Sequence, residues 1–200
     1  MKISLFDNYI WKARHADYNI YNEVRSLVSD ITTSKDLTVR SHISDEVVDT
    51  SVIHGSHDGM YGLQLFSKYE DTISNFIDFV DNEICNYILS CNWKLHDHEY
   101  IHSWINMTSN GTAQEWHTHA NSHISGVYYH NTVIEHGGII FKNPNPYVHM
   151  NLFPGNNPGI HFHPEPNTLF LFPSWMEHKT DKNRSDSQRI SIAFNVLTRH

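Results

Sequence analysis

Residues 116–129 read W-H-T-H-A-N-S-H-I-S-G-V-Y-Y, which combines a metal-ligand pattern with a strand pattern. The apolar and aromatic run over 124–129 is typical of a β-strand, and the polar residues 120–122 are typical of a turn. We therefore expect two strands joined by a short turn. Side chains two apart on a strand point to the same face, so His117 and His119 would present two imidazoles side by side. This spacing predicts two ligands of one metal ion.

A third ligand is expected from residues 169–178, L-F-L-F-P-S-W-M-E-H, where an apolar strand runs into a Pro-Ser turn and ends at His178. The last strand begins at Arg189. Its alternation puts Arg189, Ser191 and Ala193 on one face. An inward-facing Arg needs an anionic partner, because a lone buried charge is costly. The sequence thus predicts a metal beside a site for a carboxylate.

Five motifs, taken in order, resemble a known family. They are H-x-H (117–119), S-G-V-Y-Y (125–129), G-G-I-I-F (137–141), L-F-P-S-W-x-x-H (171–178) and R-x-S (189–191). Over residues 100–197 the chain is similar to the small 2-oxoglutarate/Fe(II)-dependent oxygenases of the prolyl-hydroxylase-like superfamily, which occur in bacteria and their phages. The order of all five motifs is specific, although no single motif is.

The resemblance implies a mainly β fold with flanking helices, built as a double-stranded β-helix (jelly roll, cupin-like). Residues 1–200 would form a single oxygenase domain, with 1–99 as an N-terminal extension and supporting helices and 100–197 as the β-helix core. The implied cofactors are Fe(II) and 2-oxoglutarate. His117, His119 and His178 would hold the iron. The co-substrate would contact Arg189, Ser191 and Tyr129, of which Tyr129 aligns with a tyrosine that binds the distal carboxylate in related hydroxylases.

The implied activity is that of a dioxygenase that hydroxylates an unidentified substrate with O2, releasing succinate and CO2. The substrate would be a small molecule, a peptide or a protein. One position departs from the wider superfamily, which has H-x-D or H-x-E where this chain has His119. Three neutral imidazoles leave the metal more positive than two imidazoles and a carboxylate would.

Two other functions remain open. A cupin-type dioxygenase with three His ligands would need no 2-oxoglutarate, and a non-catalytic jelly-roll binding or structural protein would keep only a vestigial metal site. Arg189 with Ser191 favours the 2-oxoglutarate enzyme over the three-His dioxygenase. Formation of succinate would distinguish the 2-oxoglutarate enzyme from the non-catalytic protein.

Two other histidine clusters compete with the predicted site. Residues 96–102, H-D-H-E-Y-I-H, would place His96, His98, Tyr100 and His102 on one face of a strand, but no third ligand group follows at a suitable distance. His161 and His163 form a second H-x-H pair just before a Pro-rich turn. In the family this position holds no ligand, so we expect surface histidines there.

Composition excludes several classes of function. The 200 residues carry a formal charge of −8, with 39% hydrophobic and 18% charged residues, which fits one globular domain. This charge argues against nucleic acid and membrane surfaces as partners. With neither a signal peptide nor a membrane span visible, the expected location is the cytoplasm, or the host cytoplasm for a phage protein. Cys85 and Cys91 are expected to be buried free thiols, and a homodimer is an open alternative.

The remaining pattern predicts further elements around the motifs. We expect a short strand over 3–6, a helix over 18–28, a loop over 51–59 that could cover the site and a long scaffold helix over about 67–90. A turn is expected over 131–135, a strand over 137–141 that begins with two glycines, and an ordered Pro-rich loop over 142–158.

Overall fold

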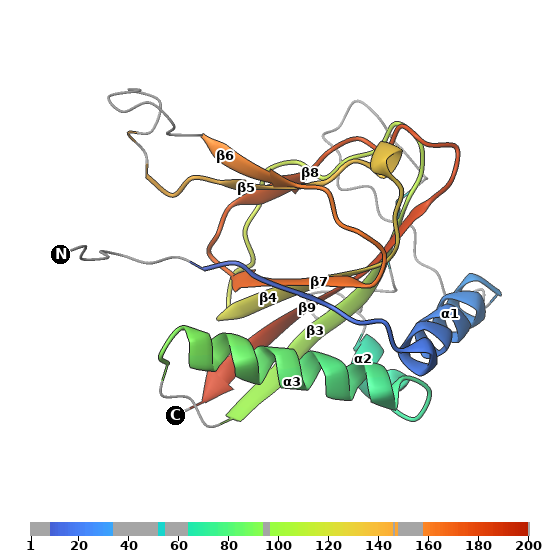
Figure 1. Cartoon of the computed structure of the whole chain (residues 1–200), viewed down its shortest axis with the longest axis horizontal. Helices are drawn as coiled ribbons and strands as arrows, with labels where there is room; N and C mark the ends of the chain where they lie inside the picture. The colour runs from blue at the N-terminus through green and yellow to red at the C-terminus, as the bar shows by residue number, and fades with distance from the viewer. Residues whose placement is uncertain are drawn as a thin grey trace.

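The computed structural model describes residues 9–33, 64–93, 97–145, 147 and 158–199, together with the backbone of 52–54. Two β-sheets face each other, and the helices lie against the outer face of the larger one and at its end (Figure 1). The elements are β1 (Trp11–Arg14), α1 (Tyr18–Thr33), β2 (Val52–His54), α2 (Leu65–Lys68), α3 (Ser74–Ser90), β3 (Asp97–Thr108), β4 (Ile124–Asn131), η1 (Ile134–His136), β5 (Ile139–Lys142), β6 (Gly159–Phe162), β7 (Thr168–Pro173), β8 (His178–Thr180) and β9 (Arg189–Arg199).

The larger sheet has the strand order β1-β7-β4-β9-β3-β2, and the smaller one has the order β6-β5-β8. All of the pairs are antiparallel. From β4 onward the chain crosses between the two sheets four times: from β4 to β5, from β6 to β7, from β7 to β8 and from β8 to β9. This mostly β architecture with flanking helices confirms the predicted class.

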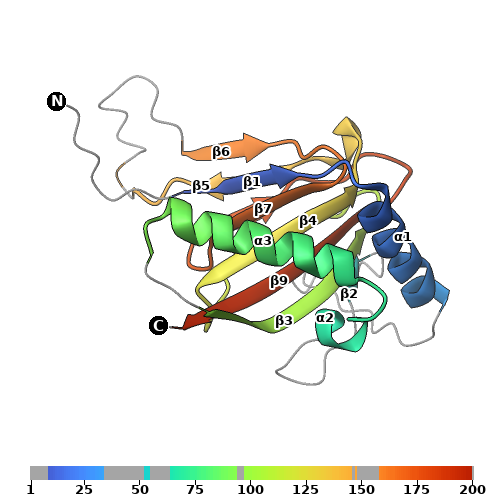
Figure 2. The same cartoon turned by 60° about the horizontal axis from the view of Figure 1, so that its bottom comes forward.

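Strand β4 separates two hydrophobic cores. Its side chains alternate, so that Ile124 and Tyr128 belong to a core between the larger sheet and the helices, while Val127 and Tyr129 belong to a second core between the two sheets. Seven of the eight β4 residues are buried, because both faces of the strand are covered. Figure 2 shows α3 lying across the strands on the outer face. The second core lines the site described below.

The scaffold helix starts later than the sequence predicted. Residues 67–90 do not form one helix, because α2 ends at Lys68 and α3 begins at Ser74. The amides of Thr72 and Ile73 both bond to the carbonyl of Tyr69, which closes a turn between the two helices. From there the apolar stripe behaves as predicted. Its buried residues fall three and four apart and pack on the sheet: Phe76, Val80, Ile84, Tyr87 and Ile88.

Two glycines of the recognised motifs are required by close packing. A Cβ on Gly126 would lie 2.1 Å from the ring of Phe194, so the β4 backbone must stay bare where that ring crosses it. A Cβ on Gly138 would lie 2.1 Å from the carbonyl oxygen of Phe162. The predicted role of the glycines before β5, to let the backbone pass close to a neighbour, is thereby confirmed.

The N-terminal half supplies both edges of the larger sheet. β1 pairs with β7, and β2 pairs with β3 through Val52, Ile53 and His54. The loop predicted over 51–59 is therefore wrong at these three residues, because their backbone finds a partner strand that local sequence does not reveal. The predicted strand at 3–6 and most of the predicted loop at 142–158 lie outside the described residues. The helix predicted over 18–28 continues to Thr33, and the turn predicted over 131–135 leads into η1.

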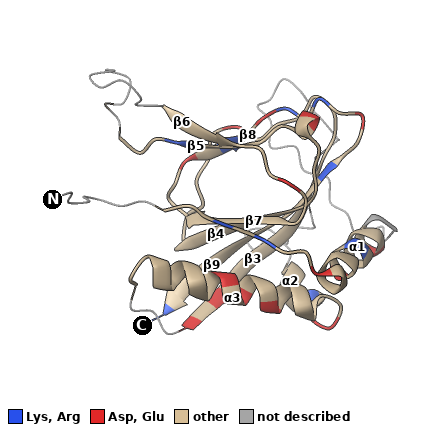
Figure 3. Ribbon diagram, in the orientation of Figure 1, with Lys and Arg blue, Asp and Glu red and all other residues tan. Residues whose placement is uncertain are grey.

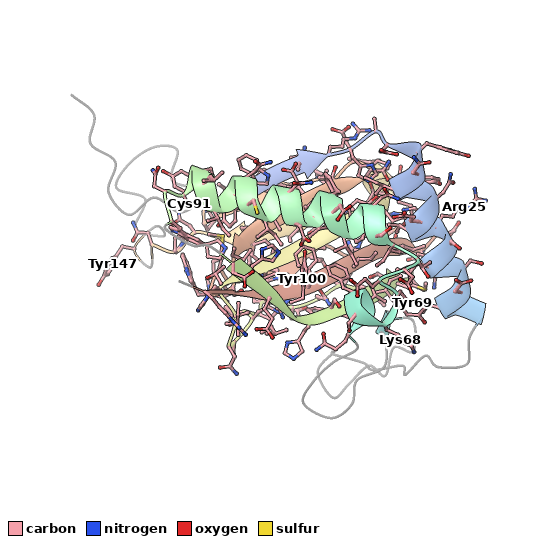
Figure 4. The ribbon with its side chains drawn as sticks, turned by 90° about the horizontal axis from the view of Figure 1, so that it is seen from below. Arg25, Lys68, Tyr69, Cys91, Tyr100 and Tyr147 are labelled. Carbon is pink, nitrogen blue, oxygen red and sulfur yellow. The ribbon has the colours of Figure 1, made fainter. Side chains whose placement is uncertain are left out.

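The two cysteines lie on α3 and directly after it. Cys85 is exposed, so its prediction as a buried thiol is wrong, whereas Cys91 at the end of α3 is partly buried (Figure 4). Both are free thiols. Asp and Glu gather along α3 (Figure 3). Within the described part of the chain, no helix is long and apolar enough to cross a bilayer.

His130 at the end of β4 predicts a pH dependence of stability. Its side chain is 6% exposed and stacks on Tyr21 of α1, with ring centroids 4.8 Å apart. Burial, with smaller effects from His15 and Arg25, lowers the pKa of His130 to about 4. Between this value and the ordinary 6.5 the unfolded chain binds a proton that the folded chain does not, so the free energy of unfolding falls as the pH falls.

We expect His130→Asn to lessen this loss by about 2 kcal/mol between pH 7 and pH 5, since the variant removes the titrating group. Urea denaturation of both proteins at the two pH values measures the difference. An equal loss of stability in wild type and variant would contradict a neutral, buried His130.

Candidate metal centre

The structure brings together the three histidines that the sequence singled out. His117, His119 and His178 each offer a nitrogen, and these atoms all lie within 4.8 Å of one another. The ring centroids are 4.2 Å apart for His117 and His178 and 5.2 Å apart for the other two pairs. No other group of three metal-binding side chains with this spacing occurs among the described residues.

The backbone around the histidines differs from the prediction. Residues 116–119 are not a regular strand, because His117 forms only an isolated bridge in which its N–H and C=O both pair with those of His178 at 3.0 Å. The amide of His119 instead donates to Ser174 O at 2.9 Å in the turn before β8. The pairing thus changes partner within two residues, which prevents a continuous ladder. The predicted turn is present, with Asn121 in the left-handed region at φ 61°.

Two of the imidazoles are oriented by backbone carbonyls. Nδ1 of His117 lies 2.7 Å from Glu115 O, and Nδ1 of His178 lies 2.9 Å from Met176 O. A carbonyl oxygen only accepts hydrogen bonds, so both Nδ1 atoms carry the proton. Each Nε2 then keeps a lone pair for a metal ion. Such bonds from the second ring nitrogen fix the tautomer and the ring direction of metal-binding histidines.

Burial keeps two of the histidines neutral. Removal from water is the main cause that lowers the pKa of His119 to about 3, followed by the neighbouring His178, His117 and His102. Burial and then His117 lower the pKa of His178 to about 4. Only a neutral imidazole can bind a metal. At neutral pH these two side chains would therefore bind an ion without first losing a proton.

Arg189 is a buried cation in the same cavity. Its side chain is 2% exposed, and Nη1 donates to His136 O at 2.7 Å and to Asp181 O at 3.4 Å. Both partners are neutral carbonyls, and in the part of the chain that the structure describes no carboxylate forms an ion pair with this guanidinium. Burial lowers the pKa of Arg189, because it disfavours the charged form, and this effect exceeds the opposing effects of Tyr129 and Asp181. An anion bound here would remove that cost.

Hydroxyl groups lie beside Arg189 in one row across the larger sheet. Tyr129 is paired in register with Ser191 on β9 and with Thr168 on β7. Burial raises the pKa of Tyr129, so its phenol stays protonated and can donate. Oγ of Thr168 is fully buried and has no hydrogen-bond partner. The row thus offers hydroxyl groups that can donate hydrogen bonds to the oxygen atoms of an anion held near the guanidinium.

The cavity that holds these groups measures about 40 Å³. Its aromatic wall includes Phe172, whose ring centroid is 4.7 Å from that of His178. Trp104 lies on the other side, 5.9 Å from His119. The sequence did not single out several of its polar lining residues: Asn106, Thr108, Gln114 and Thr180. Alternation along β3 could have indicated the first two, since they share a face with Trp104.

The two competing histidine clusters serve other purposes. A bulge in β3 between Tyr100 and His102 reverses the faces, so the prediction that His102 shares a face with His98 and Tyr100 is wrong. His96, the first residue of the predicted row, lies outside the described residues. Tyr100, between β3 and α3, bonds to Asp81, as does His98 at 2.9 Å (Figure 4). His102 falls after the bulge and is close enough to His119 to lower its pKa. A one-residue bulge is not visible in a polar sequence.

The second H-x-H pair lies on the surface, as predicted. His161 and His163 are both exposed, on and just after β6, and their ring centroids are 4.1 Å apart. Nε2 of His161 pairs with Oδ2 of Asp181 at 2.6 Å. This ion pair, together with the exposure, accounts for His161 without a metal.

The chain is similar to known proteins in family and in fold. Residues 102–195 match the family described as "Putative 2OG-Fe(II) oxygenase". No curated protein matches the chain. Among solved structures, a Pseudomonas putida prolyl-4-hydroxylase is 13% identical with a TM-score of 0.58, over 94% of this chain and 92% of that one. A Trichoplax adhaerens prolyl hydroxylase, solved with a peptide fragment of hypoxia inducible factor, is 15% identical with a TM-score of 0.62, over 95% and 84%.

A third similar structure is the epimerase SnoN in complex with Fe3+, alpha ketoglutarate and nogalamycin RO. It is 10% identical with a TM-score of 0.64, over 95% of this chain and 79% of that one. At these identities the likeness concerns the fold. The predicted double-stranded β-helix is confirmed, and so is the resemblance to the oxygenase family that the motifs indicated.

Proposed function

We propose that this chain is an Fe(II)- and 2-oxoglutarate-dependent dioxygenase, because residues 102–195 match the 2OG-Fe(II) oxygenase family. His117, His119 and His178 hold the iron, and Arg189 with Ser191 and Tyr129 holds the co-substrate. The observation that carries the proposal is one cavity that contains both a cluster of three histidines and a buried guanidinium that forms no ion pair with a carboxylate of the described residues. The first suits a metal, and the second suits an anion beside it.

The donor set fits iron. Imidazole is a good ligand for Fe(II), and a metal ion held by three protein ligands would have positions left for a co-substrate and oxygen. His119 stands where the superfamily usually has a carboxylate, so the protein itself contributes no negative charge to the ion. A dianionic co-substrate would offset both the positive charge of the metal ion and the positive charge of Arg189. This pairing explains why both positive groups can share one small buried cavity.

The protein's own residues bind and orient the co-substrate. A guanidinium has five N–H donors in a planar fork, and the two bonds from Nη1 leave donors for a carboxylate. Tyr129 and Ser191 add hydroxyl donors from the same face of the sheet. Phe172 and Phe141, whose rings lie 4.7 and 6.0 Å from that of His178, keep water from the inner side of the site.

When bound, iron with 2-oxoglutarate would supply oxidation of a substrate C–H bond by O2, with release of succinate and CO2. The substrate is a small molecule or a peptide. A three-His dioxygenase that works without 2-oxoglutarate is the second candidate, and its support is His119 itself. Arg189 favours the first candidate, because the second leaves this buried charge without an anion.

Succinate formation tests the proposal. We expect the purified protein to convert 2-oxoglutarate to succinate slowly in the absence of its substrate, only with Fe(II) and O2 present, and we expect a chelator to stop the reaction. Calorimetry under nitrogen should show 2-oxoglutarate binding that depends on the metal. Binding of iron without any affinity for 2-oxoglutarate would move the assignment to the three-His dioxygenase. Binding of neither would leave a vestigial site.

A further inference from the structure

For His119, the third histidine of the cluster, no backbone acceptor at Nδ1 is found among the described residues. Its Nδ1 instead lies 3.5 Å from the amide nitrogen Nδ2 of Asn195 on β9, in an amide whose nitrogen and oxygen can exchange places by half a rotation. That amide continues into two hydroxyls, since Ser125 Oγ lies 2.8 Å from Asn195 Oδ1 and 2.8 Å from Ser174 Oγ. We call Asn195, Ser125 and Ser174 the relay. All three side chains are at most 5% exposed.

The relay is fixed at both ends by the backbone of the site. Asn195 and Ser125 are paired in register on β9 and β4, which places their side chains on the inner face. The carbonyl of Ser174 accepts from the amide of His119 at 2.9 Å. Ser174 thus binds the backbone of His119 and also forms the far end of the relay, which reaches the ring of His119 through Ser125 and Asn195.

Direction within the relay determines the tautomer of His119. With the NH2 of Asn195 toward the ring, Nδ1 must be the acceptor, and the proton then sits on Nε2, which cannot bind a metal. With the amide turned by half a rotation, Oδ1 accepts from Nδ1–H and Nε2 keeps its lone pair. The two orientations occupy nearly the same volume, and the amide alone does not select between them.

The serines also allow the second orientation, because they give the turned amide nitrogen an acceptor. Asn195 Nδ2 then donates to Ser125 Oγ, and the hydroxyl of Ser125 donates to Ser174 Oγ, because a hydroxyl both donates and accepts. An unpaired buried amide would be unfavourable, because it loses its hydrogen bonds to water without gaining others. The relay therefore supplies His119 with the acceptor that Glu115 O and Met176 O supply to the other two rings.

We propose that Asn195 is the positioning residue for His119, presenting its amide oxygen to Nδ1, with Ser125 and Ser174 setting the direction of the relay. This inference rests on the proposed function, in that it assigns the outer partner of one ligand in that metal site. It makes all three histidines alike, each with Nδ1–H bonded to an oxygen and Nε2 toward the ion.

Four variants test the proposal, with Co(II) as the probe and affinity measured by calorimetry. Outer partners of metal ligands are typically worth about 10–100-fold in metal affinity, so Asn195→Leu should weaken binding by that factor. Asn195→Asp keeps an oxygen acceptor and should stay within about threefold of wild type. Ser125→Ala should fall between them. Ser103→Ala is the matched control, because this buried serine lies on the outer face of the same sheet, where it accepts a hydrogen bond from Phe66 N. This variant should leave the affinity for Co(II) unchanged.

Nitrogen NMR of the Zn(II)-loaded, 15N-labelled protein gives a second readout that does not depend on affinity. We expect His119 to carry its proton on Nδ1 in wild type and in Asn195→Asp. Wild-type affinity in Asn195→Leu, equal losses in the Asp and Leu variants, or a proton on Nε2 of His119 would overturn the inference. If the Leu variant fails to fold, the Ser125→Ala and Asn195→Asp pair and the NMR assignment still decide it. A wild type that binds no metal would overturn the proposed function and the inference together.

Discussion

Replacing His178 by alanine is expected to abolish Fe(II) binding. This residue is 4% exposed, its ring is the nearest neighbour of His117, and its backbone N–H and C=O hold His117 in place. The substitution removes one of three ligands, so the loss should exceed the roughly 10–100-fold expected for an outer partner. Calorimetry with Fe(II) under nitrogen measures it, and a thermal melt shows whether the variant is folded.

The surface H-x-H pair provides the control for this experiment. His161→Ala and His163→Ala remove imidazoles with the same spacing in sequence, but both rings are exposed, and His161 pairs with Asp181. Neither change should alter the affinity for iron. The site would be misplaced if one of these variants lost the metal while His178→Ala kept it.

Arg189→Ala should raise the dissociation constant of 2-oxoglutarate about ten- to a hundredfold, because hydrogen bonds to charged groups contribute roughly 1.5–3 kcal/mol. Affinity for the metal should hardly change, because the expected metal ligands are the three clustered histidines and Arg189 is not a ligand. Titration of the metal-loaded protein with 2-oxoglutarate measures the effect. Arg189→Lys should lose less, because it keeps the charge but not the planar fork.

Exposed Arg184, five residues earlier on the segment that leads into β9, offers a matched control. Arg184→Ala removes the same kind of side chain outside the cavity and should bind 2-oxoglutarate like wild type. Equal affinities in wild type and Arg189→Ala would show that the buried guanidinium has another role, and the anion site would have to be sought elsewhere.

Patterns within single strands predicted the centre of this protein well. The alternation of β9 placed Arg189 and Ser191 on the inner face, and the apolar run of β4 formed the strand expected of it. These predictions succeed because both sheets are covered, so that the face of each side chain follows from period two. The meeting of His178 with the first two histidines came from the recognised order of motifs, since nothing local brings residues so far apart together.

Long-range pairing explains what the sequence did not reveal. β1 and β2 join the edges of the larger sheet through partners more than fifty residues away, so their short sequences carry little strand signal. The bulge in β3 moves His102 to the side of the metal centre by a single residue. The alternation of β9 puts Asn195 on the same face as Arg189 but does not reveal that it lies beside a histidine of the cluster. The contact between Asn195 and His119 depends on where β9 lies in the larger sheet relative to the segment that carries His119.

The most direct test is a crystal structure of the protein grown under nitrogen with Fe(II) and 2-oxoglutarate. We expect one iron bound by Nε2 of His117, His119 and His178, and a 2-oxoglutarate whose far carboxylate lies against Arg189, Ser191 and Tyr129. Iron at His161 and His163, or at the three histidines with no 2-oxoglutarate beside Arg189, would contradict the proposed enzyme.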